Sequence, residues 1–143
     1  MTPSPATLPT VKPIAKDGNS TLANGKKYSY KPFKPLSIMI TEYINYLEKI
    51  KGYSPETATA YKRDLRQFVS FIKQNYPSAG WSTINRGIVE HYIMTLVGYG
   101  ELPTSTNRKL SAISGLYRYM ALHGYDIENP AQYCSRRKVA EKI

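Results

Sequence analysis

The sequence predicts an all-α fold, and three observations favour it. From Leu36 onward, apolar residues recur three and four positions apart, which is the period of an amphipathic helix. No stretch alternates apolar and polar residues as a half-buried strand does. Ser, Pro and Gly residues stand where helices would begin and end. With 143 residues, 41% of them hydrophobic, we expect one domain, a compact all-α bundle of four helices over residues 36–133.

The segments on either side of this bundle differ from it in composition. Residues 1–35 hold six of the ten prolines, and six lysines against the single acid Asp17. Because proline fixes φ and lacks an amide hydrogen, this density excludes a helix and disfavours a sheet, so we expect a flexible, disordered N-terminal arm. Residues 134–143 have the composition of a basic tail or of the start of an interdomain linker.

The first helix is expected over residues 38–51, with Ser37 as its N-cap and Gly52 as its stop. One apolar stripe supports it: Ile40, Tyr43, Ile44, Leu47 and Ile50. The second helix is better marked, because Ser54-Pro55-Glu56 supplies an N-cap, a proline at the first helical position and an acid for the helix dipole. It is expected to reach Asn75, with a buried stripe of Ala58, Tyr61, Leu65, Phe68 and Ile72, broadened by Val69 and Phe71.

A turn over residues 77–80 leads to Trp81 and Ile84, which we expect to close over the core. The third helix is expected over residues 86–97, with Ile88, Val89, Tyr92, Ile93 and Leu96 buried, and Gly98 and Gly100 ending it. The fourth begins after Pro103 with Thr104 as its cap and runs to about His123. Its inner face is expected to hold Leu110, Ile113, Leu116, Tyr117 and Met120.

The charge balance bears on the kind of partner. Lys and Arg number 20 against 10 Asp and Glu, a net charge of +10 at neutral pH. This excess predicts attraction to polyanions, nucleic acid first.

The single cysteine, Cys134, excludes an internal disulfide framework and a cysteine-based zinc site. Because neither an 18-residue apolar run nor a signal-peptide stretch is present, we expect a soluble, cytoplasmic protein with no membrane partner.

No catalytic site is evident in the sequence. His91 and His123 have no cysteine or acid at metal-ligand spacing, and Asp126 and Glu128 lie in a turn where acids commonly cap helices. Phosphate-binding glycine loops, dinucleotide fingerprints and serine nucleophile elbows are also missing. We therefore expect no cofactor, no metal, no small-molecule ligand and no enzymatic activity of this chain alone.

The polar faces of the second and fourth helices are more informative, because they are basic, rich in small hydroxyl residues and short of acids, with Asp64 as an exception. Such faces suit contact with double-stranded DNA. The expected phosphate contacts are Lys62, Arg63, Arg66, Arg108, Lys109 and Arg118. The polar groups on the groove-facing turns are Thr57, Thr59, Ser105 and Asn107, and Thr104 is a further DNA-binding candidate on the same polar face. Reversing the charge of Arg63 or Arg108 is expected to weaken DNA binding without unfolding the bundle. The basic arm has two possible roles, none or contact with the DNA backbone.

At these same residues the sequence resembles the N-terminal core-binding domain of the tyrosine recombinase, or phage integrase (Xer-like), family. The similarity covers roughly residues 38–131 and rests on three motifs in order. These are Gly52-Tyr53-Ser54-Pro55-Glu56-Thr57 with Tyr61, Arg63-Asp64-Leu65, Phe68 and Phe71; Ser105-Thr106-Asn107-Arg108-Lys109-Leu110-Ser111-Ala112-Ile113 through Leu116-Tyr117-Arg118-Tyr119-Met120; and Glu128-Asn129-Pro130-Ala131.

The resemblance implies a compact four- to five-helix, SAM-like orthogonal bundle that forms half of a clamp around a recombination site. Its second and fourth helices would lie across the major groove. It also implies that the chemistry belongs to a separate C-terminal domain carrying an arginine, a lysine, a His-x-x-Arg group and a nucleophilic tyrosine. We expect that domain to be absent here, since Met94 and Asp126 stand where the arginine of His-x-x-Arg would follow the two histidines.

Two other functions stay open at this stage. The first is a protein-interaction module that assembles recombinase subunits, for which the first helix would present Asn45, Tyr46 and Glu48 opposite its apolar stripe. The second is a standalone truncated accessory protein that competes for recombination sites. The sequence also leaves the recognised DNA sequence and the type of mobile element undefined.

Overall fold

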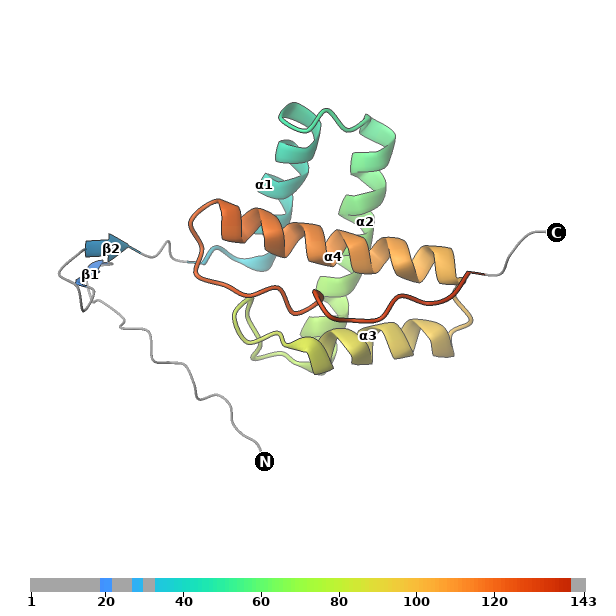
Figure 1. Ribbon diagram of the computed structural model, residues 1–143. Helices are drawn as coiled ribbons and strands as arrows, with labels where there is room; N and C mark the ends of the chain where they lie inside the picture. The colour runs from blue at the N-terminus through green and yellow to red at the C-terminus, as the bar shows by residue number, and fades with distance from the viewer. Residues whose placement is uncertain (1–18, 22–26, 30–32, 140–143) are drawn as a thin grey trace.

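Four helices form the body of the protein in a computed structural model, which describes residues 19–21, 27–29 and 33–139. They are α1 (Leu36–Lys49), α2 (Pro55–Asn75), α3 (Arg86–Gly98) and α4 (Pro103–Leu122). α1 and α2 run side by side, α4 crosses them, and α3 lies along α4 (Figure 1). The prediction of an all-α bundle is confirmed, with four helices in the described part of the chain.

Two three-residue strands precede the bundle, β1 (Asn19–Thr21) and β2 (Lys27–Ser29). They pair antiparallel, with Asn19 opposite Ser29 and Thr21 opposite Lys27. Their stretch lies between Pro13 and Pro32 and contains no proline, so each amide can donate to a ladder. Three residues are too few for an alternating pattern to be recognised in the sequence. The rest of the expected flexible arm, apart from residues 33–35, lies outside the described residues.

The helix ends match the sequence signals in α2 but not in α1 or α4. The Ser54 hydroxyl accepts a hydrogen bond from the Thr57 amide at 3.2 Å, and Pro55 occupies the first helical position, as predicted. Ser37 and Thr104 were expected as N-caps, and both predictions are wrong. The extended residues Pro35 and Leu102 precede these helices without a side-chain cap, so Ser37 and Thr104 fall inside the first turn. Gly52, with φ of +74°, follows α1 as expected.

The core lies where the apolar stripes of the helices meet. Trp81 and Ile84 close over it as predicted, and the buried Tyr117 hydroxyl donates to the Trp81 carbonyl at 2.8 Å. One stripe residue was placed wrongly, because Ile50 follows the last turn of α1 and is 72% exposed. Tyr61 and Ile93 are half-buried rather than buried. The buried stripe residues are Ile40, Tyr43, Ile44, Leu47, Ala58, Leu65, Phe68, Val69, Phe71, Ile72, Ile88, Val89, Tyr92, Leu96, Leu110, Ile113, Leu116, Tyr117 and Met120.

The contact between α1 and α4 depends on a glycine. Gly115 of α4 faces the ring of Tyr43 on α1, and a Cβ at this position would overlap the Tyr43 hydroxyl oxygen while lying 3.4 Å from Cζ. Because glycine has no side chain at position 115, the Tyr43 phenol can occupy this space.

This close approach predicts a non-additive pair of substitutions. Gly115→Ala in the unaltered chain should lower the free energy of unfolding by about 1–3 kcal/mol, because the new methyl group overpacks the site. In a Tyr43→Phe background the overlap with oxygen is gone, and the same substitution should be neutral or stabilising by up to about 1 kcal/mol, the helix preference of alanine over glycine. Urea unfolding followed by circular dichroism measures both. An equal effect of Gly115→Ala in the two backgrounds would contradict the packing described here.

Candidate nucleic-acid interface

A cluster of three cations lies on the outer face of α2. Thr59, Lys62, Arg63 and Arg66 line one shallow depression, with Arg63 and Arg66 exposed and Lys62 half-buried. None of the three cations forms an ion pair with an acid among residues 33–139. Residues separated by three and four positions share a helix face, which is why 59, 62, 63 and 66 converge. The structure thus brings these four predicted site residues together, and no acid in the described part of the chain pairs with the three cations among them.

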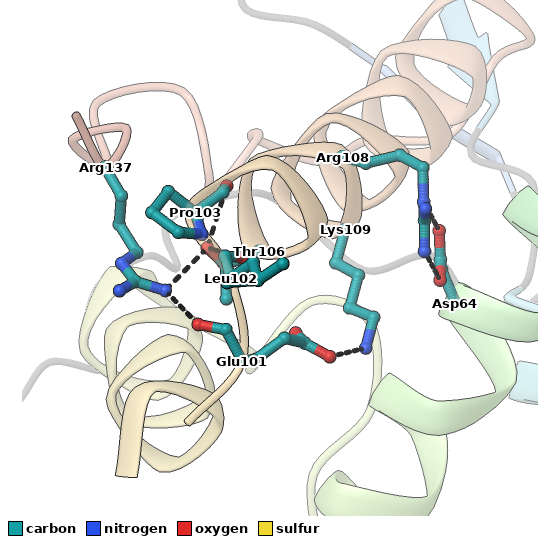
Figure 2. Close-up of polar contacts among 8 residues, drawn as sticks. All are labelled: Asp64, Glu101, Leu102, Pro103, Thr106, Arg108, Lys109 and Arg137. Atoms are coloured by element: carbon teal, nitrogen blue, oxygen red, sulfur yellow. Dashed lines mark hydrogen bonds and ion pairs between the residues drawn. The ribbon is translucent and has the colours of Figure 1, made fainter. Parts of the chain in front are cut away.

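Arg108 joins this face to α4 through an ion pair. Its Nε and Nη2 atoms donate to the two carboxylate oxygens of Asp64 on α2, at 2.7 and 3.0 Å (Figure 2). The Asp64 side chain is 1% exposed, whereas that of Arg108 is 40% exposed. The hydrogen bond to Asp64 and the carboxylate charge raise the pKa of the guanidinium above its usual range. Two parallel bonds fix the guanidinium plane, so Arg108 is held in one orientation at the junction of the helices.

Lys109, the neighbour of Arg108, points the other way. Its side chain is 8% exposed, and Nζ donates to Glu101 Oε2 at 2.5 Å, as Figure 2 shows. A buried ammonium group requires such a partner, because desolvation of an unpaired charge is costly. The prediction that Lys109 belongs to the exposed polar face is therefore wrong. Its acid partner lies in the loop between α3 and α4, a contact that the pattern within one helix does not reveal.

Asn107 binds the C-terminal segment of the chain. Its Nδ2 donates to the Arg137 carbonyl at 2.9 Å, and its Oδ1 accepts from the Arg137 amide at 2.8 Å. Both polar atoms of the side chain are engaged with residues 30 positions away, although the sequence pattern assigned Asn107 to a DNA groove. We name the segment held in this way, residues 134–139, the C-terminal strap. Its interaction with α4 was not foreseen from the sequence.

The remaining candidates lie along the two helices with varied exposure. Thr57 is exposed, and its hydroxyl accepts from Ser54 at 3.0 Å. Thr104 is exposed and Ser105 half-buried in the first turn of α4. Arg118 is exposed three turns further along, where it donates to Ser114 Oγ at 3.1 Å. Arg118 is therefore set apart from the cluster on α2, although it lies on the same helix as Arg108.

The described residues show little that resembles a catalytic or metal site. His91 is exposed beside the Tyr76 hydroxyl at 2.7 Å, and His123 follows the last turn of α4 with Nδ1 2.8 Å from the Tyr119 carbonyl oxygen. Over residues 33–139 no three His, Cys, Asp or Glu side chains gather closely enough to hold a metal ion. No helix in that range is both long and apolar enough to cross a membrane.

Comparison with known proteins agrees with this fold. Residues 40–124 match the family described as phage integrase, N-terminal SAM-like domain, and since the match covers more than half of the sequence, the chain belongs to that family. No solved structure matches the chain.

Several similar curated proteins are bacterial recombinases. The tyrosine recombinase XerC of Lactobacillus delbrueckii subsp. bulgaricus is 28% identical over 102 residues, 71% of this chain and 34% of that protein. The XerC proteins of Lacticaseibacillus casei and Pelobacter propionicus are each 32% identical, over 69% and 77% of this chain and 33% and 36% of their own length. The chain thus spans about a third of the length of the curated relatives it matches.

The Asp64–Arg108 pair predicts an asymmetry in stability. Arg108→Met leaves the Asp64 carboxylate buried without a cation, and should lower the free energy of unfolding by about 3 kcal/mol. Replacing both residues, as Asp64→Leu with Arg108→Met, removes the charge as well and should cost less than the single substitution. Urea unfolding at neutral pH measures these values. For the same reason Arg108→Glu, which adds a second carboxylate, is expected to unfold the domain rather than to act on binding alone.

The matched control is Arg86→Met. Arg86 pairs with Glu90 at 2.9 Å, but both side chains are well exposed, so its loss should change stability by less than about 1 kcal/mol. If Arg108→Met is as mild as Arg86→Met, Asp64 does not depend on Arg108.

Proposed function

We propose that this chain is the DNA-binding, or core-binding, module of a tyrosine site-specific recombinase, and that it holds duplex DNA against α2 and α4. The observation that carries the proposal is the unopposed cluster of Lys62, Arg63 and Arg66, joined to α4 by Arg108. Membership in the integrase N-terminal family supports it independently. An excess of positive charge on one face is the electrostatic signature of phosphate recognition.

We infer different tasks for the candidate residues from their contacts and exposure. Lys62, Arg63 and Arg66 have no acidic partner among the described residues, so their donors are available to phosphate oxygens. Arg108 uses two donor atoms on Asp64, and its remaining Nη1 group is free to act as an oriented phosphate contact. Arg118 supplies a further contact along α4. Thr57, Thr59, Thr104 and Ser105 are the small polar groups that would lie nearest the base edges.

The rest of the reaction belongs to another part of a recombinase. Because the similar XerC proteins are about three times longer than the matched region, we propose that DNA cleavage and joining reside in a separate C-terminal domain, and that this chain alone is not an enzyme. Its partners would be double-stranded DNA and other recombinase subunits bound to the same site, in the cytoplasm of a prokaryote or in a phage-infected cell. No cofactor is needed for this role.

Assembly through α1 has less structural support than DNA binding. The ring of Tyr46, one of the residues expected to be presented for subunit contact, packs 4.9 Å from that of Tyr119 and 5.2 Å from that of His123. Tyr46 is therefore half-buried within the domain, and only Asn45 of the three expected residues is fully exposed.

The salt dependence of DNA binding tests the electrostatic account. Of the six expected phosphate contacts, five are accessible, namely Lys62, Arg63, Arg66, Arg108 and Arg118, and Lys109 is buried. If all five contact phosphates, they should contribute about −4 to −5 to the slope of the logarithm of the association constant against the logarithm of salt concentration. Combining Arg63→Glu with Arg66→Glu should weaken binding by at least about tenfold and reduce the magnitude of the slope by about 2. Fluorescence anisotropy with a labelled duplex measures both quantities.

The matched control is Arg86→Glu on α3, a helix to which the proposal assigns no DNA contact. Per residue it makes the same change in charge at an exposed arginine, and should leave the slope nearly unchanged. A wild-type chain whose binding is independent of salt, or an Arg63→Glu/Arg66→Glu variant that binds like wild type, would refute the proposed surface.

A further inference from the structure

The C-terminal strap is fastened to the first turns of α4 by more than the Asn107 side chain. Arg136 Nη1 donates to the Asn107 carbonyl at 2.8 Å. Arg137 Nη1 donates to the Glu101 carbonyl at 2.7 Å and to Thr106 Oγ1 at 3.2 Å. Together with the two bonds of the Asn107 amide, these contacts hold two consecutive arginines at the start of α4.

The strap keeps its positive charge in this arrangement. The acceptors of Arg136 and Arg137 are two carbonyl oxygens and one hydroxyl, all of them neutral. Figure 2 shows that the Glu101 carboxylate turns to Lys109, whereas Arg137 reaches only the main chain of Glu101. Lys138 is exposed and has no acidic partner over residues 33–139. Arg136 and Arg137 are therefore held in place without being neutralised, and the exposed Lys138 follows them directly.

The strap also lies beside the face formed by α2 and α4. Burial is the main influence on the pKa of the Tyr61 phenol of α2 and raises it. The positive charges of Arg108 and Arg136 act on the same phenol in the opposite direction. The geometry agrees, because Arg136 donates to the carbonyl of Asn107, the residue before Arg108, and Arg108 contacts α2 directly.

We propose that the C-terminal strap is a third element of the DNA-contacting surface, in which Arg136, Arg137 and Lys138 bind phosphates next to those held by α2 and α4. Asn107 is then a positioning residue: it holds the strap through both atoms of its amide and does not read a base. This inference rests on the proposed function, since it adds contacts to the same duplex.

A double-mutant cycle in the 143-residue chain tests both parts. The neutral-strap variant carries Arg136→Gln, Arg137→Gln and Lys138→Gln, and is compared with Asn107→Ala and with the combination of the two. Binding to a labelled duplex is measured by anisotropy at several salt concentrations. The neutral-strap variant should bind at least about tenfold more weakly, with a slope smaller by about 2 to 3. As a single substitution, Asn107→Ala should weaken DNA binding. In the neutral-strap background it should weaken binding by less than twofold, because the strap that Asn107 holds no longer binds phosphates.

The control for net charge combines Lys49→Gln, Lys51→Gln and Arg86→Gln, which removes three exposed cations outside the proposed surface. It should weaken binding far less than the neutral-strap variant. Thermal unfolding by circular dichroism checks that each variant is folded, and Arg136→Gln alone replaces the neutral-strap variant in the cycle if the latter is not.

The outcomes separate the two claims. Binding by the neutral-strap variant that equals wild type, or equals the charge control, overturns the strap as a DNA contact while the α2–α4 surface stands. A full Asn107→Ala effect in the neutral-strap background shows that Asn107 touches DNA directly and overturns its positioning role. A wild-type chain that does not bind duplex DNA refutes the proposed function and the strap with it.

Discussion

The bidentate ion pair between Asp64 and Arg108 is the constraint on which the basic surface depends. It joins the middle of α2 to the first half of α4, where the two helices cross, and it satisfies a carboxylate that is almost fully buried. A buried acid needs a cation at one position and in one orientation, so the pair fixes how α4 lies on α2. The cluster around Arg63 and Arg66 and the polar residues at the start of α4 consequently keep their relative placement only while this pair is intact.

The fold could be predicted because its helices are long and strongly periodic. The spacing of Leu65, Phe68 and Ile72 indicates one buried face of a helix without any knowledge of the neighbouring helices. Ser54-Pro55 marks the start of α2 through contacts that lie within four residues of the sequence. The N-cap predictions were wrong for α1 and α4, because these helices begin directly after the extended residues Pro35 and Leu102, which offer no capping side chain. The prediction that Ile50 is buried was wrong because the apolar spacing continues in the sequence by one residue beyond the end of α1.

The candidate site was only partly predictable, because residue type reports polarity and not burial. Lys62, Arg63 and Arg66 lie away from the apolar stripe, and the structure gathers them on one face. Lys109 has the same character as Arg108, yet its position three residues after Thr106 and four before Ile113 places it on the buried side. Asp64 carries the same signal, three residues after Tyr61 and four before Phe68, so helical phase would have identified both. No local signal leads to the Asn107–Arg137 contact, whose partners are 30 residues apart.

The most direct test of a DNA-binding surface shared by α2 and α4 is a two-dimensional amide NMR titration of the ¹⁵N-labelled chain with duplex DNA. The account predicts that the largest shift changes fall in residues 57–66 of α2 and in the first half of α4, extending to residues 136–138. Changes confined to α1 and α3, with residues 57–66 unaffected at saturation, would contradict it.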